Sequence, residues 1–330
     1  MSSRNEYFDF LRGVAIMMVV AIHTVPHVTG YNSWQEDFIL VVRQIMNCAV
    51  PLFLAISGYF LSRKVLDNKS NILNFWKKQI SRVLIPMIIW GMGWFVAAIL
   101  INHSLSNIFL NLILLFCGGF SVYYFVALII QCYIILPILT KCNWGGVIAC
   151  GMLSLVAIVI TSYYINYNGN NYPLLLYAGP IYLWIIFFML GIYIAKNPNK
   201  DYLTIGITVT LIGLILQIIE SKFLLEYIGK GIGIKTSSFI FSAGVILCAL
   251  SQKTQEAFKS SKITQYIAWI GEVSFGVYLI HNYCITLFLK MTKTDNWFIM
   301  WGLSLALTLF IIIVMKRIIP EKPLKKYFGF

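Results

Sequence analysis

The first apolar segment of the chain carries three polar side chains that fall on one face of a helix. Eleven residues separate Arg12 from His23, close to three helical turns, and Asp9 precedes Arg12 by three. That separation puts His23 about 16 Å along the axis from Arg12, roughly half the depth of a bilayer core. An ionisable group at this depth usually faces a bundle interior or a wet cavity. We therefore predict that His23 carries the chemistry; a helix-packing histidine bonded to a neighbouring hydroxyl is the alternative.

A second polar face appears near the C-terminal end, where Ser274, Tyr278 and His281 are spaced by four and three residues. These side chains either hydrogen-bond across a helix interface or border the cavity that holds His23. We expect them to border that cavity, and a catalytic role for His281 is a further possibility.

No metal site or disulfide framework is expected. His23 and His27 have metal-ligand spacing, but no glutamate follows His23 and Pro26 disturbs the turn. His27 and His103 are expected near outer helix ends, where histidines are solvated. The seven cysteines are scattered without a C-x-x-C pair.

Composition indicates a chain that lies in lipid. Apolar residues make up 59% of the 330 and charged residues 11%, whereas soluble domains carry roughly 25% charged residues. We predict an all-α, polytopic membrane protein with about ten transmembrane helices, forming a single domain over residues 1–330. The expected spans are 8–28, 38–61, 82–101, 122–140, 146–165, 175–195, 202–219, 234–251, 267–289 and 297–316. Residues 104–120 are apolar but interrupted by Gly118-Gly119, which suggests a short re-entrant or interfacial piece.

Charge asymmetry supports ten spans with both termini in the cytoplasm. With that topology, nineteen of the 25 lysines and arginines fall in inside segments and five in outside segments. The net charge of +13 then reflects basic loops against anionic lipid rather than nucleic-acid binding. Six of the basic residues lie between 63 and 82. They either only set the orientation of the chain in the membrane or also surround and bind a phosphorylated ligand.

The second span contains Pro51 and the pair Ser57-Gly58. This combination predicts a bent helix whose backbone approaches another helix or a ligand closely.

Five motifs in order resemble the acyltransferase 3 family of integral membrane acyltransferases, over about residues 5–325. They are Arg12-x10-His23 with Asp9 and Gly13, Phe53-Leu-Ala-Ile-Ser-Gly-Tyr-Phe60, Arg82-Val-Leu-Ile-Pro86, the segment from Ser274 to His281, and Glu321-Lys-Pro323. The chain departs from the family at Tyr123-Tyr124-Phe125, where Trp, an aromatic and Leu are frequent. No SGNH-type domain follows the tenth span, so the chain is similar to the stand-alone members.

The resemblance implies a membrane-bound O-acyltransferase that moves acetyl from acetyl-CoA to a hydroxyl of a surface glycan or lipid-linked sugar. A neutral imidazole at His23 would act as general base, or form an acyl-imidazole that passes the acyl group on. Arg12, held by Asp9, would orient a CoA phosphate. Arg63, Lys78 and Arg82 would extend that grip, and Ser57, Tyr59, Tyr124, Ser274, Tyr278 and His281 would line the cavity. No permanently bound cofactor is expected, and the resemblance places the protein in a bacterial inner membrane.

Two rival hypotheses remain. Ten spans with intramembrane charge also suit a transporter or exporter of a glycan or amino acid, although no inverted repeat is evident. The enzyme could equally use succinyl-CoA as donor, and the sequence carries no marker that separates the two donors.

Overall fold

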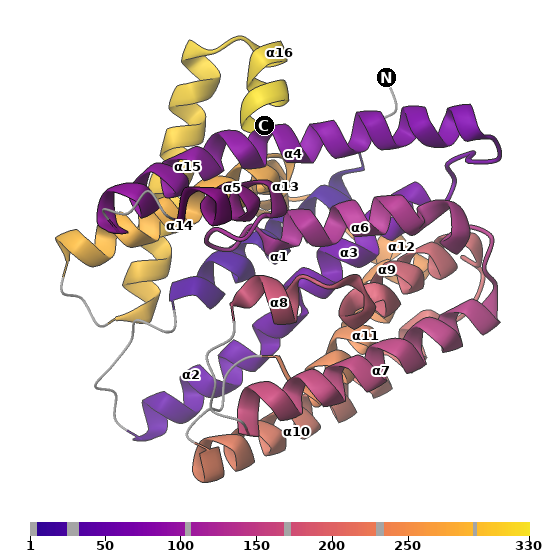
Figure 1. Cartoon of the computed structure of the whole chain (residues 1–330). Helices are drawn as coiled ribbons and strands as arrows, with labels where there is room; N and C mark the ends of the chain where they lie inside the picture. The colour runs from indigo at the N-terminus through magenta and orange to yellow at the C-terminus, as the bar shows by residue number, and fades with distance from the viewer. Residues whose placement is uncertain (1–4, 25–32, 103–106, 168–172, 229–233, 293–295) are drawn as a thin grey trace.

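The computed structural model describes residues 5–24, 33–102, 107–167, 173–228, 234–292 and 296–330, and these residues form helices joined by turns, with no strand among them (Figure 1). His27 and His103 lie outside the described residues. The helices, in chain order, are α1 (Glu6–Thr24), α2 (Ser33–Ile45), the 3-10 turn η2 (Met46–Cys48), α3 (Ala49–Leu61), α4 (Lys69–Asn102), α5 (Ile108–Cys117), α6 (Tyr124–Leu139), α7 (Trp144–Tyr167), α8 (Leu174–Ala178), α9 (Ile181–Lys196), α10 (Tyr202–Ile228), α11 (Thr236–Leu250), α12 (Gln252–Ala257), α13 (Lys262–Glu272), α14 (Ser274–Met291), α15 (Trp297–Ile318), α16 (Glu321–Pro323) and the π-helical turn η4 (Leu324–Phe328).

Six helical stretches of the described chain are long and apolar enough to cross a membrane: Glu6–Thr24, Asp37–Leu61, Lys69–Leu100, Trp144–Tyr164, Tyr202–Tyr227 and Trp297–Ile318. A seventh is possible if α13 and α14 are counted as one bent span. α6, α9 and α11 are apolar but have only 15 or 16 residues. The protein is therefore a polytopic helical membrane protein, and the count of about ten spans stays a prediction.

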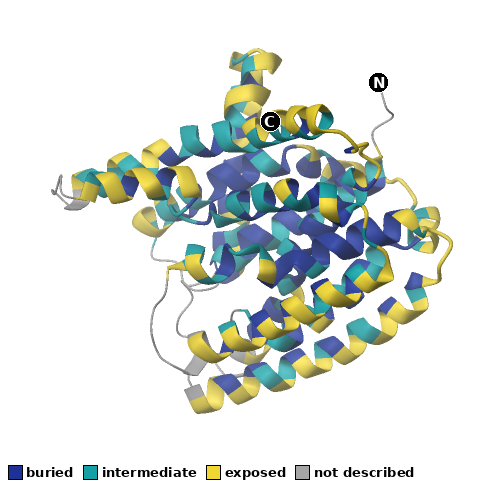
Figure 2. Cartoon of the chain, turned by 45° about the vertical axis from the view of Figure 1, so that its right-hand side comes forward, coloured by how far each residue is buried: buried dark blue, intermediate teal, exposed yellow. Residues whose placement is uncertain are grey.

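Buried residues gather on inner helices of the bundle and exposed residues on outer ones (Figure 2). Twelve of the sixteen residues of α9 are buried. α7 and α10 instead expose large apolar side chains such as Ile148, Val156, Ile207 and Ile215. An exposed apolar surface of this kind is expected where helices face the lipid of a membrane, because lipid tails are themselves apolar.

Glycines let four helices approach each other at backbone distance. A Cβ at Gly58 of α3 would lie 2.2 Å from the carbonyl oxygen of Phe188 in α9, and one at Gly191 would lie 2.0 Å from that of Ala55. Between α1 and α13, a Cβ at Gly271 would lie 1.8 Å from the carbonyl oxygen of Asp9. Small residues at membrane helix interfaces permit such contacts. The close approach predicted for the Ser57-Gly58 pair is confirmed.

Two of the predicted spans are not single regular helices. The second consists of α2 and α3 joined by η2, which ends three residues before Pro51. Pro51 has no N–H to bond the carbonyl of Asn47 in η2. The ninth is broken at Val273, and α13 and α14 meet at a bend of 78°. Gly271 is held against the backbone of α1 at that break, so α14 leaves in a new direction.

Several basic segments assigned to the cytoplasm lie together at one end of the bundle. Lys196 donates to the carbonyl of Thr140, Lys253 forms an ion pair of 2.9 Å with Asp201, and Ser260 donates to Glu6 at 2.7 Å. These contacts join the turns around residues 140, 200 and 255 to the start of α1. The described N- and C-terminal segments also lie at one side of the molecule (Figure 1). We call this the inner end.

Candidate active site

A cavity of about 1560 Å³ runs through the bundle and is lined by residues of α1 and both segments of the second span, and by residues of α4, α6, α9, α11, α13, α14 and the C-terminal turns. Pockets for a single small ligand are usually roughly 300–1,000 Å³. The cavity is therefore larger than a typical pocket for one small ligand.

His23 lines this cavity and contacts a second histidine. Its ring lies 5.4 Å from that of His281, centroid to centroid, with an angle of 38° between the planes. His281 is fully buried, and its Nδ1 lies 3.1 Å from the carbonyl oxygen of Val277. A carbonyl oxygen only accepts, so Nδ1 carries the hydrogen and Nε2 keeps its lone pair. Nε2 has no hydrogen-bond partner among the described residues.

Indole groups of α15 hold the outer half of α1. Trp297 Nε1 donates to the carbonyl of Ala21 and to the hydroxyl of Thr24, both at 3.0 Å, and Trp301 Nε1 donates to the carbonyl of Met17 at 3.0 Å. Trp297 is completely buried. These bonds flank His23 on both sides along the chain and restrict movement of its backbone.

Arg12 lies on the same face of α1 as His23, nearer the start of the helix, and its guanidinium is held by neighbouring side chains. Its Nη1 donates to Oδ1 of Asp9 at 2.9 Å, and its guanidinium lies 5.1 Å from the ring centroid of Phe60. The Asp9 side chain is almost fully buried, whereas a third of the Arg12 side chain is exposed. A charge-assisted bond to a buried carboxylate orients the guanidinium, and the side chain lines the cavity.

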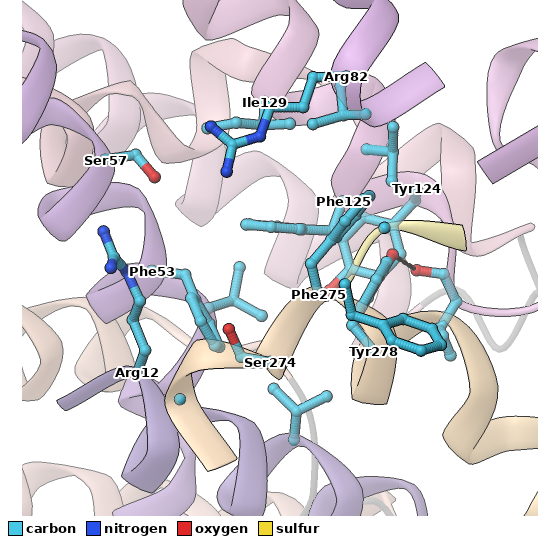
Figure 3. A pocket seen from close by; sticks show the side chains of 18 of the residues that line it. Arg12, Phe53, Ser57, Arg82, Tyr124, Phe125, Ile129, Ser274, Phe275 and Tyr278 are labelled. Atoms are coloured by element: carbon cyan, nitrogen blue, oxygen red, sulfur yellow. Dashed lines mark hydrogen bonds between the residues drawn. The ribbon is translucent and has the colours of Figure 1, made fainter. Parts of the chain in front are cut away.

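Basic side chains surround the inner part of the cavity. Arg12 and Arg82 point toward a common space, which the Ser57 hydroxyl also faces (Figure 3). The lining residues with positive charge here are Arg12, Lys78, Arg82, Lys316, Lys322, Lys325 and Lys326, and those with negative charge are Glu272 and Glu321. Lys325 forms an ion pair with Glu321 and holds the pKa of that carboxyl below its ordinary value, so Glu321 is ionised at neutral pH. We call this set of basic residues the basic rim.

Reciprocal hydrogen bonds hold the middle of the cavity. Tyr123 donates to the carbonyl of Leu279 at 2.8 Å, and Tyr278 donates to the carbonyl of Val122. The ring of Tyr278 also contacts Phe125 and Phe275 (Figure 3). The Tyr278 hydroxyl proton is therefore engaged with the backbone, and its ring forms part of an apolar wall.

Most of the residues predicted for the site are brought to this cavity, and four are not among its lining. Its lining includes Arg12, His23, Ser57, Lys78, Arg82, Tyr124, Ser274 and Tyr278, while Asp9 reaches it through Arg12.

The other three predicted residues lie elsewhere for identifiable reasons. Arg63 is exposed beyond the end of α3, past the turn at Ser62. Tyr59 turns toward α1, where its ring lies 4.9 Å from that of Phe8. His281 is one helical turn beyond Tyr278 and is completely buried, and its ring contacts that of His23, which lines the cavity.

The sequence prediction missed two groups of lining residues. The C-terminal lysines of the basic rim were assigned to topology alone, and Arg43 with Asn47 was assigned no role. The C-terminal segment reaches the cavity because Phe330 packs on Gly276, where a Cβ would lie 2.2 Å from its ring. Such a contact between distant parts of the chain leaves no local pattern.

The described residues contain no group of three histidine, cysteine, aspartate or glutamate side chains placed to hold a metal ion. A bundle of apolar helices surrounds a cavity with a pair of imidazole rings at its wall and basic side chains at one end. This arrangement defines a multi-pass membrane protein with an internal reaction or transport site.

Comparison with known proteins shows the family to which the chain belongs. The sequence model of the family described as "Acyltransferase domain" matches residues 5–317, and the chain belongs to this acyltransferase 3 family of membrane acyltransferases. A relative in Enterococcus gallinarum, named serine/alanine racemase, is 26% identical over 95% of this chain. The chain corresponds to 46% of that protein, less than half its length. No solved structure matches.

Proposed function

We propose that the protein is an O-acyltransferase that transfers acetyl from acetyl-CoA to a hydroxyl of a surface glycan or lipid-linked sugar in the bacterial inner membrane. The observation that carries this proposal is the placement of His23 and Arg12 in one continuous cavity with the basic rim. Membership of the acyltransferase family supports the reaction class.

The basic rim suits the donor. CoA carries a pyrophosphate and a ribose phosphate, and guanidinium and ammonium groups bind phosphate oxygens with charge-assisted hydrogen bonds. With the phosphates at Arg12, Lys78 and Arg82, the linear pantetheine arm would extend along α1 toward His23, about 16 Å away along the axis.

His23 then has the role of general base. The acceptor hydroxyl oxygen attacks the thioester carbonyl while His23 takes the hydroxyl proton; the carbon–sulfur bond breaks, and CoA leaves as a thiolate that takes up a proton. A route through an acyl-imidazole forms the same ester in two steps. His281 is a positioning residue, because its ring supports that of His23 and does not line the cavity.

The test uses membranes that contain the wild-type chain and acetyl-CoA labelled with ¹⁴C in the acetyl group. We expect label in extracted glycan or lipid-linked sugar, and less label with unlabelled acetyl-CoA as competitor. A matched reaction with labelled succinyl-CoA identifies the donor. Absence of label from either donor in membranes that hold folded protein would contradict acyl transfer.

Transport of a small polar solute is the second candidate. Intramembrane ionisable residues around a cavity also suit a transport pathway. The relative's name refers to serine and alanine, so an amino acid is the solute to test. The discriminating measurement is uptake of labelled L-serine into proteoliposomes that contain the purified protein. Concentrative or exchange uptake without any acyl transfer would move the assignment to a carrier.

A further inference from the structure

The far part of the cavity, away from the basic rim, contains a buried cation with too few acceptors. Arg43 at the end of α2 lines the cavity and is 7% exposed. Its Nη1 donates to Oδ1 of Asn47 at 2.5 Å, while its Nε has no partner among the described residues. No carboxylate of the described chain lies within ion-pair distance of Arg43; the acidic residue nearest along the chain, Asp37, pairs instead with Lys222 at 3.3 Å.

The neighbours of Arg43 add donors rather than acceptors. Asn47 Nδ2 donates to the side-chain oxygens of Gln44 and Gln217, at 2.9 and 2.8 Å. Lys235, which is 1% exposed, donates to the same Gln44 oxygen at 2.5 Å and to the hydroxyl of Ser221. The Nε2 of Gln217, a fully buried residue, has no acceptor among the described residues. Every amide oxygen in this cluster is therefore already engaged.

One carboxylate lies close to the cluster, and it is committed to α11. Glu220 accepts from the backbone N–H of Ser237 at 2.9 Å and from its hydroxyl. Arg43 therefore has no ion-pair partner among the described residues. An uncompensated buried charge is costly in a protein interior and more so in a bilayer, which makes a ligand with negative charge the natural partner.

The cluster lies at the end of the bundle opposite to the basic rim. Lys235 precedes the first residue of α11, whereas Tyr7 donates to the carbonyl of Ala249 at the last turn of that 15-residue helix, at 2.5 Å. At 1.5 Å per residue the two ends are about 21 Å apart. The lining of the cavity also includes the polar side chains of Asn47, Ser238 and Ser242 and the aromatic side chains of Tyr124, Tyr177, Trp184 and Phe239.

We propose that Arg43 forms the centre of an anion subsite that recognises a carboxylate or phosphate group on the acceptor, so that the acceptor is an anionic sugar. This inference rests on the proposed acyl transfer, since it assigns the far part of the cavity to the acceptor and the basic rim to the donor. Asn47 fixes the guanidinium by accepting from Nη1, and the remaining Nη donors are left for the ligand. A planar guanidinium suits bidentate contact with either anion.

Thermal unfolding of the purified protein in detergent, followed by tryptophan fluorescence, tests the subsite without any acyl transfer. The probes are glucuronate for the carboxylate, glucose 1-phosphate for the phosphate and glucose as the neutral sugar, at matched ionic strength. A ligand that binds the folded state raises the unfolding temperature. We expect a higher unfolding temperature with glucuronate or glucose 1-phosphate and no change with glucose. The probe that gives the larger increase identifies whether the subsite prefers carboxylate or phosphate.

The variants assign the effect to Arg43. Arg43→Gln should lose the anion-dependent increase and keep the increase produced by acetyl-CoA, and Arg43→Lys should retain part of the anion effect. Lys222→Gln is the matched control, because it removes an exposed charge on the adjacent helix. If Arg43→Gln does not fold, the test uses Arg43→Lys. Its anion-dependent increase in unfolding temperature should then be smaller than that of wild type.

Three results would overturn the subsite: no anion-dependent increase in wild type, an equal increase with glucose, or an undiminished anion effect in both Arg43 variants. A failure of the proposed acyl transfer is distinguishable, because it appears as the absence of acetyl-CoA binding and of label transfer while the anion effect at Arg43 persists.

Discussion

The rings of His23 and His281 lie 5.4 Å apart between centroids, with His23 at the cavity surface and His281 completely buried behind it. The two residues are far apart in the chain, on α1 and α14, and the Nδ1–H of His281 is bound to the carbonyl of Val277. His281 therefore presents a fixed ring against the residue that we assign as the base.

The first prediction concerns this pair. His281→Phe keeps an aromatic ring and removes both nitrogens, so we expect a fall in kcat of about 100-fold through displacement of His23, with the KM for acetyl-CoA unchanged. Because the base is displaced, the pH dependence of kcat should also change in shape. The measurements are kcat and KM across pH, with the unfolding temperature as a check on the fold. Wild-type kcat with an unchanged pH profile would show that His281 has no effect on His23.

The second prediction concerns the tether on Arg12. Arg12→Gln removes the guanidinium, and Asp9→Asn weakens the 2.9 Å bond that orients it. Loss of one charge-assisted bond costs about 1.5–3 kcal/mol, which corresponds to an increase of about 10- to 100-fold in the KM for acetyl-CoA in Arg12→Gln. Asp9→Asn should have a smaller increase. Lys253→Gln, which breaks an exposed ion pair with Asp201, is the control and should leave KM unchanged.

The third prediction concerns the basic rim. We expect the variant Lys322→Gln/Lys325→Gln/Lys326→Gln to raise the KM for acetyl-CoA and to reduce its dependence on salt, because exposed charges act over about a Debye length that salt shortens. Acetyl-CoA titrations at low and high ionic strength measure both effects. Lys69→Gln/Lys77→Gln is the control, since neither lysine lines the cavity. Equal salt dependence in all three proteins would remove the C-terminal lysines from the donor site.

The fourth prediction concerns the contact between α1 and α13. Gly271→Ala places a Cβ 1.8 Å from the carbonyl oxygen of Asp9, so the helices must separate. Overpacking of this kind costs about 1–3 kcal/mol, and we expect both a lower unfolding temperature and weaker acetyl-CoA binding, because Asp9 and Arg12 move with α1. Gly302→Ala has no atom within 4 Å and should keep wild-type stability. Equal stability of the two variants would show that the close contact is absent in solution.

Local periodicity accounts for what the sequence predicted well. Asp9, Arg12 and His23 are on one helix, so a period of 3.6 residues places them on one face without further information. The helical fold and the apolar lipid-facing surface follow in the same way from runs such as 144–167 and 202–228. The interruption at Gly118-Gly119 is also confirmed, because α5 ends at Cys117 and Gly118 has a φ of 71°.

Features that depend on contacts between distant segments escaped prediction. The bend at Val273 follows from the packing of Gly271 on α1, and the return of the C-terminal segment follows from Phe330 against Gly276. Tyr59 lies beside Phe8 instead of the cavity for the same reason. The donor surplus around Arg43 involves α2, η2, α10 and α11, and none of these segments is unusual by itself.

Acetyl transfer by the His23→Ala variant is the most direct test of the central claim. The assay compares wild type, His23→Ala and His27→Ala in membranes with labelled acetyl-CoA, after equal amounts of folded protein and equal acetyl-CoA binding have been established. If His23 is the base, transfer should fall by about 10²- to 10⁴-fold in His23→Ala and stay near wild type in His27→Ala. Undiminished transfer by folded His23→Ala would contradict the assignment of the reaction to the first helix.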